Sequence, residues 1–179
     1  EVGSGFSSAA MLDSADSLGL KNVRFTFIDP DPERLKSLLR KEDYLRCAVI
    51  EESLQHVDIG IFDDLEENDI LFIDSSHVCK TGSDVNKIFF EIFPRLHKKV
   101  LIHFHDVFFP FEYPKAWVLG WNSFGWNEAY FLRAFLMYNT DFEILFFNTY
   151  LEHRYRERFA KTMPDCLKNE GGSLWIRKK

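Results

Sequence analysis

The sequence predicts an α/β fold built around a mostly parallel sheet. Short continuous apolar runs recur along the chain, and such runs are typical of strands buried on both faces of a parallel sheet. Between these runs lie segments in which apolar residues follow helical spacing. Strands and helices in alternation indicate βαβ units, whose functional sites lie at the carboxyl ends of the strands.

The predicted strands share continuous apolar character or an excess of β-branched and aromatic residues. They are residues 23–28, 70–73, 100–102, 142–147 and 173–176. Glu1 and Val2 are expected to end a further strand, whose first half is absent, because a central strand needs about five residues.

Helices are predicted between the strands. Asp31 and Pro32 supply an N-cap and a first-turn proline, and three leucines follow at helical spacing. From Val85 to Phe93 the apolar residues recur every three or four positions, and Pro94 is expected to end that helix. A further helix is predicted at about residues 127–138.

The composition fits one globular domain over residues 1–179, expected to lack its N-terminal part. Apolar residues make up 46% and charged residues 28% of the chain, which argues against disorder. A net charge of −6 does not attract nucleic acid or anionic lipid, and no apolar run approaches the roughly 20 residues that cross a bilayer. The 3 cysteines are scattered and fit a reducing cytoplasm. We therefore expect a cytoplasmic protein without nucleic-acid or membrane partners.

A glycine-rich segment at the start of the chain predicts a nucleotide-binding loop. Gly3 and Gly5 allow a sharp turn out of a strand, and a helical stretch follows; Ser8 stands where a dinucleotide fingerprint has Gly or Ala. Asp29 ends the next strand, 24 residues beyond Gly5, where a carboxylate can accept hydrogen bonds from both ribose hydroxyls of an adenosine. The alternative is that the glycines serve the turn alone and Asp29 only starts the next turn.

These residues, with two later motifs, resemble the class I S-adenosylmethionine-dependent methyltransferases. The motifs are the segment from Asp69 to His77, which contains a DxxH pattern, and the His105-Asp106 pair. The closest subgroup has these motifs and a C-terminal SLW strand, and includes small-molecule and sugar O-methyltransferases and cephalosporin-hydroxylase-like proteins. The resemblance spans the chain from Glu1 to Ile176.

The resemblance implies a Rossmann-like three-layer sandwich with a mostly parallel seven-stranded sheet whose last strand is antiparallel. It also implies that S-adenosylmethionine is the cofactor. Gly3 and Gly5 would pass under its methionine part, Asp29 would hold the ribose, and Glu51 with its neighbours would flank the adenine. The remaining residues expected to contact the cofactor are Glu1, Ser7 and Asp74.

Two groups of polar residues follow predicted strands and are expected to converge at one edge of the sheet. They are residues 74–77 and residues 103–106. His77 is the predicted general base, because its ordinary pKa of about 6.5 suits proton abstraction near neutrality. Asp74 and Asp106 are the other predicted catalytic residues. The alternative for His77 is a helix cap or a bond to a backbone carbonyl.

Asp74, His105 and Asp106 are also candidate ligands for a divalent cation. Some similar O-methyltransferases hold Mg²⁺ there with acids only, and the metal lowers the pKa of the substrate hydroxyl. His105 departs from that pattern because Mg²⁺ prefers oxygen ligands, so Mn²⁺ or no metal are the alternatives. Asp74 could equally orient His77. His103, inside the strand, is expected to be buried and hydrogen-bonded.

The segment from Val107 to Trp126 is dense in aromatic residues and has no clean period. We predict a long ordered loop that closes over the acceptor, since aromatic walls suit a sugar face, a ring or an acyl chain. A homodimer interface would use the same residues. The segment from Glu152 to Arg158 is charged and is expected to be solvated.

The predicted reaction is O-methylation of a hydroxyl on a small molecule or sugar. One rival is an NAD(P)-dependent oxidoreductase with the same loop, which Ser8 and the lack of a suitable Tyr-x-x-x-Lys pair disfavour. The other is an inactive methyltransferase-like binding subunit, which intact Gly3, Gly5 and Asp29 disfavour.

Overall fold

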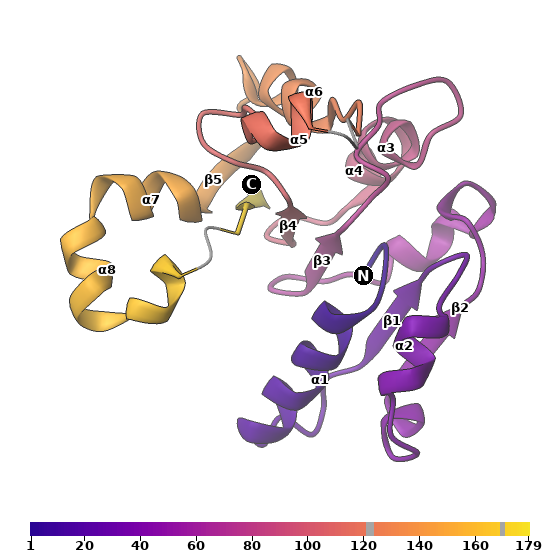
Figure 1. The fold of residues 1–179 in the computed structure, drawn as a ribbon. Helices are drawn as coiled ribbons and strands as arrows, with labels where there is room; N and C mark the ends of the chain where they lie inside the picture. Colours follow the sequence, from indigo (N-terminus) through magenta and orange to yellow (C-terminus); the bar gives the residue numbers. More distant parts are fainter. Residues whose placement is uncertain (121–123, 169–170) are drawn as a thin grey trace.

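The computed structural model describes residues 1–120, 124–168 and 171–179, and it shows a mixed α/β fold (Figure 1). The strands are β1 (Phe25–Ile28), β2 (Cys47–Ile50), β3 (Ile70–Ile73), β4 (Leu101–His105), β5 (Phe142–Phe147) and β6 (Ser173–Lys178). The helices are α1 (Phe6–Ser17), α2 (Glu33–Leu38), α3 (Asp84–Lys87), α4 (Phe93–Arg95), α5 (Lys115–Leu119), α6 (Glu128–Leu136), α7 (Asn148–Arg154) and α8 (Arg156–Thr162).

The strands form a two-stranded and a four-stranded group. β1 and β2 are parallel, β3 and β4 are parallel, and β6 runs antiparallel between β4 and β5. The prediction of a seven-stranded sheet is therefore wrong for the described chain, although the antiparallel last strand is confirmed. The reason is that the position between β1 and β3 is taken by Val2 alone, as an isolated parallel bridge to Ile28 and to Ile73.

Val2 nevertheless connects the two groups through the backbone. Its N–H donates to the carbonyl of Phe72 at 2.8 Å, and its own carbonyl accepts from the N–H of Asp74 at 2.8 Å. On the other side, the N–H of Gly3 donates to the carbonyl of Ile28 at 2.9 Å. The ends of β1 and β3 are thereby held on either side of the glycine loop.

Apolar side chains pack on both faces of this central region. Phe27 points to α1 and α2, where it packs with Leu12 and Leu35, whereas the next residue, Ile28, belongs to the main core. Because neighbouring residues of a strand face opposite sides, the two clusters lie on opposite faces of the sheet. The main core fills the space beneath α3, α4 and α6 with buried residues of β3, β4 and β6.

The other face of the four-stranded group carries stacked rings. His103 of β4 stacks on Phe72 with 4.0 Å between ring centroids, and Trp175 meets its edge at 4.7 Å. His103 is buried as expected, but neither ring nitrogen has a hydrogen-bond partner in the described parts of the chain, so that part of the prediction is wrong. Burial, reinforced by the nearby charge of His105, lowers the pKa of His103 to about 3. His103 is therefore a neutral aromatic packing residue.

The predicted helices form with shifted ends. α2 begins at Glu33, and the side chain of Asp31 does not cap it. Pro94 does not end its helix at once, because α3 continues through a π-helical segment, Ile88–Ile92, into α4. The Val107–Trp126 segment contains the one-turn helix α5 as well as loop, and its Trp121 lies outside the described residues.

The charged segment near residue 155 folds into α7 and α8, which Figure 1 shows extending to one side of the sheet. Among the helices of residues 1–120, 124–168 and 171–179, none has the length and apolar character needed to cross a membrane.

Candidate active site

The glycine loop packs directly against the end of β3. Gly3 has a φ of +81°, and a Cβ built on it would lie 2.3 Å from the carbonyl oxygen of Asp74. No side chain fits in that space, and the left-handed backbone independently favours glycine. Gly3 is thus required by the close approach of two neighbouring chain segments, which brings the loop beside Asp74.

Glu1 organises the start of α1. Its two carboxylate oxygens accept hydrogen bonds from the hydroxyls of Ser7 and Ser8, each at 2.5 Å. Ser8 Oγ also accepts from the N–H of Gly5 at 2.9 Å. The serine at the third fingerprint position therefore fixes the loop by hydrogen bonding rather than by small size.

Asp29 lies at the end of β1 and contacts the same loop. Ser4 Oγ donates to its Oδ2 at 2.6 Å, and the N–H of Asp31 donates to its Oδ1 at 2.8 Å. A carboxylate has about four acceptor positions, so two remain for an external donor pair. Asp29 therefore offers, beside the glycine loop, the two acceptor positions that a pair of ribose hydroxyls would require.

Glu51 follows β2 and is exposed, with an ion pair to Lys36 at 2.7 Å. Across the sheet, β1 and Val2 lie between β2, which precedes Glu51, and β3, which precedes Asp74. Arg34 is a neighbour of the loop that the sequence did not indicate. Its Cδ would lie 3.1 Å from a Cβ on Gly5, and its guanidinium lies 5.6 Å from the ring centre of Phe6.

His77 lies between two carboxylates. Its Nε2 is 3.2 Å from Oδ1 of Asp74, and its Nδ1 is 2.9 Å from Oε2 of Glu128. The ring is buried, and its φ of +57° is uncommon for a residue with a side chain. Strained backbone of this kind concentrates at functional sites. The helix-cap alternative does not hold, because Ser83 caps α3 by accepting from the N–H of Asn86.

The two carboxylates decide the charge of His77. Burial opposes the imidazolium form, but hydrogen bonds to Asp74 and Glu128 outweigh it and raise the pKa of His77 to about 9. Burial likewise opposes ionisation of Asp74, yet the hydrogen bond to His77 and the nearby His105 lower the pKa of Asp74. The pair is therefore ionic at neutral pH, with a proton on each ring nitrogen of His77.

Glu128 is the functional candidate that the sequence did not reveal. It is fully buried, accepts from Ser75 Oγ at 2.8 Å, and its N–H donates to the carbonyl of His77 at 3.1 Å. An acid in the first turn of a helix is ordinary, because it interacts favourably with the helix dipole. Only the fold brings this one to His77, from 51 residues away in the sequence.

Asp106 follows β4 and lies close to Asp74 and His77. One possible ligand atom from each of these residues lies within 4.8 Å of the others, and Asp106 shares the left-handed backbone with a φ of +56°. Burial raises the pKa of Asp106. His105 lies outside this group, half exposed, with its Nε2 3.6 Å from Asp106 Oδ1.

The three grouped residues fit a divalent cation poorly. Both ring nitrogens of His77 are engaged with carboxylates, and an imidazolium has no lone pair for a metal. Two carboxylates remain, which is few for the near-octahedral oxygen shell of Mg²⁺. The predicted ligand set with His105 stays a prediction.

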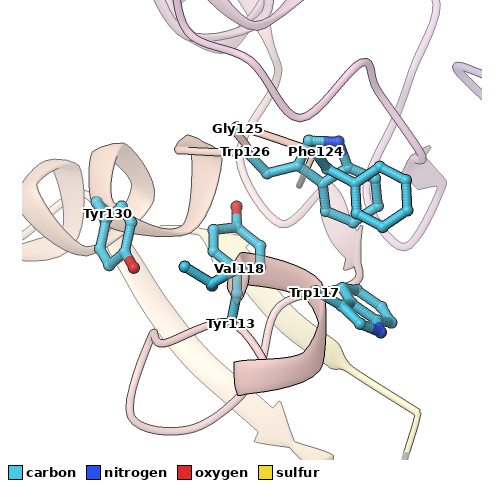
Figure 2. Close-up of a pocket in the computed structure, with 7 residues that line it drawn as sticks. All are labelled: Tyr113, Trp117, Val118, Phe124, Gly125, Trp126 and Tyr130. Carbon is cyan, nitrogen blue, oxygen red and sulfur yellow. The ribbon is translucent and has the colours of Figure 1, made fainter. Parts of the chain in front are cut away.

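An aromatic pocket borders this charged group. Trp126 contacts His77 with 4.1 Å between ring centroids. The same indole lines a pocket of about 170 Å³ with Tyr113, Trp117, Val118, Phe124, Gly125 and Tyr130 (Figure 2). The aromatic loop therefore reaches the expected catalytic residues.

Comparison with known proteins identifies the family of the chain. A family model described as a methyltransferase domain matches residues 1–107, more than half of the chain. The matched part contains the glycine loop, Asp29, the Asp74–His77 pair and Asp106. A search of curated proteins finds no significant match. The chain, with its glycine loop held between two strand-end carboxylates, therefore belongs to the methyltransferase-domain family.

Proposed function

We propose that the protein is an S-adenosylmethionine-dependent methyltransferase that methylates a hydroxyl group of a small molecule. One observation carries the proposal: the glycine loop lies between Asp29 on one side and the Asp74–His77 pair on the other. A cofactor-binding group and a proton-accepting group therefore share one edge of the sheet.

Asp29 holds the ribose of the cofactor through its two remaining acceptor positions. When bound, S-adenosylmethionine supplies a methyl group on a positively charged sulfur. Asp74, Glu128 and Asp106 contribute negative charge near His77, which favours a cationic ligand at this edge. The chain thus offers both the hydrogen-bond acceptors and the charge that such a cofactor needs.

His77 accepts the proton of the acceptor hydroxyl at Nε2, while Glu128 holds Nδ1 and fixes the ring. His77 is a base only in its neutral form. With a pKa of about 9, roughly one molecule in a hundred is neutral at pH 7. A positive charge bound nearby lowers that pKa and increases the neutral fraction. The rate of methyl transfer should therefore rise with pH in a single-proton step whose midpoint lies below pH 9.

Calorimetric titration tests the cofactor. S-adenosylhomocysteine should bind and NADH should not; the reverse result would support the oxidoreductase. Asp29→Asn should weaken S-adenosylhomocysteine binding by about tenfold, because a charged acceptor is lost. Asp31→Asn, two residues away and exposed, is the matched control and should bind normally.

His77→Ala tests the base. The variant should keep its affinity for S-adenosylhomocysteine and lose about a hundredfold in methyl transfer over a panel of hydroxyl acceptors. Turnover near the wild-type rate would remove His77 from the mechanism. Cofactor binding without turnover in the wild-type protein would instead favour the inactive binding subunit.

A further inference from the structure

The aromatic pocket has a chemistry that narrows the acceptor. Its lining residues within the described chain are five aromatic side chains, Val118 and Gly125. Several rings stand nearly perpendicular to one another: Trp117 meets Trp126 at 88° and Tyr113 meets Tyr130 at 87°. Figure 2 shows Phe124 and Trp126 stacked on one side of the pocket and Tyr130 on the other.

Each tyrosine hydroxyl of this pocket makes one hydrogen bond to the protein. Tyr113 Oη accepts from the N–H of Ala129 at 2.9 Å, and Tyr130 Oη donates to Glu112 at 2.9 Å. None of the described lining residues carries a charge. The described lining side chains offer a sugar ring only two hydroxyl groups and two indole N–H groups. A sugar entering here would therefore replace only part of its hydrogen bonds to water, which costs free energy for each hydroxyl group left unpaired.

The size of the pocket matches one ring. Its volume is about 170 Å³, and an apolar protein cavity of about 150 Å³ is known to hold benzene. Perpendicular walls suit an aromatic guest, since edge-to-face contacts contribute about 0.5–1.5 kcal/mol beyond burial alone. A long acyl chain would have to extend out of the pocket into solvent.

The pocket is physically tied to the charged group. Trp126 contacts His77 and lines the pocket. At the start of α6, Glu128 binds His77 while the next residue, Ala129, binds Tyr113. A ring in this pocket is therefore placed one indole away from the proposed base.

We propose that this pocket holds a single uncharged aromatic ring of the acceptor, so that the acceptor is a small phenol or aryl alcohol. The role of the bound molecule as methyl acceptor rests on the proposed methyl transfer. Binding of the ring itself is independent of the cofactor. In a phenol the reacting oxygen is on the ring, and in an aryl alcohol it is on a short side chain that reaches past Trp126.

Ligand-observed NMR on the cofactor-free protein tests ring binding directly. The probes are phenol, 2-phenylethanol, cyclohexanol, methyl glucoside and tetramethylammonium. The two aryl probes should bind about threefold to tenfold more tightly than cyclohexanol, which corresponds to the edge-to-face contribution. Equal binding of methyl glucoside, or tighter binding of tetramethylammonium, would overturn the proposal.

Filling the pocket gives a matched pair of variants. Val118→Trp should weaken binding of the aryl probes at least about tenfold, whereas Leu119→Trp, on the exposed neighbouring position of α5, should leave it unchanged. Unchanged aryl binding in Val118→Trp would contradict the assignment. So would a change of oligomeric mass in that variant, which would make this surface a homodimer interface.

Turnover with S-adenosylmethionine shows which of the probes is methylated. Methylation of phenol or of 2-phenylethanol supports the proposal and says where the hydroxyl lies; methylation of the glucoside but of neither aryl probe overturns it. Failure of the two proposals is distinguishable. Aryl binding without S-adenosylhomocysteine binding would retain the ring pocket and refute the methyltransferase, and the opposite pattern would do the reverse.

Discussion

Replacing Glu128 by Gln should change the charge of His77 without changing the shape of the site. Gln has the size of Glu, can accept the hydrogen bond from Nδ1 of His77, and can still bond Ser75. It lacks the negative charge that favours the imidazolium. The substitution therefore separates the electrostatic role of Glu128 from its packing.

The magnitude follows from the titration of His77. A pKa of about 9, against the ordinary 6.5, corresponds to about 3 kcal/mol of folding stability. Because the pKa is raised in the folded state, this stabilisation is fully present below pH 6.5 and is lost as the pH rises to about 9. Asp74 and Glu128 both contribute, so Glu128→Gln should remove roughly half of it, or 1–2 kcal/mol, at pH 6.

The assay is urea denaturation of both proteins between pH 6 and 9.5, with NMR titration of the His77 ring. Wild type and variant should differ most at pH 6 and converge above pH 9, and the pKa of His77 should be lower in the variant. Glu91→Gln, an exposed acid in the helical segment after α3, controls for loss of a carboxylate elsewhere. A pH-independent difference, or a wild-type His77 that titrates near 6.5, would refute the ion-pair account.

Three further results are expected. Gly3→Ala should lower the free energy of unfolding by about 3 kcal/mol or more, because its methyl group would overlap the backbone of Asp74. Gly19 also has a left-handed backbone but lies in open space, so Gly19→Ala should lower it by only about 1 kcal/mol in the same denaturation assay. Asp43→Ala should cost about 2–3 kcal/mol because buried Asp43 pairs with two arginines; exposed Asp13→Ala, which removes one partner of the same network, should cost under about 1 kcal/mol. Dialysis against EDTA should change methyl transfer by less than about twofold, and a large loss restored by Mg²⁺ or Mn²⁺ would establish the metal site.

The sequence alone determined the α/β class and most of its strands, whereas β2, α5, α7 and α8 were not predicted. Its apolar runs are local signals, so β3, β5 and β6 lie at or within a residue or two of the predicted ranges. The convergence of Asp74 and Asp106 could also be predicted, because the parallel strands β3 and β4 bring their carboxyl ends together.

Other features were decided only by the tertiary structure. The pairing of Val2 with both Ile28 and Ile73 depends on neighbours distant in sequence, and it replaces a full central strand in the described chain. The charge of His77 depends on Glu128, whose position no local pattern indicates. Periodicity and spacing report which residues are near one another along the chain, whereas charge states and pockets depend on which residues meet through space.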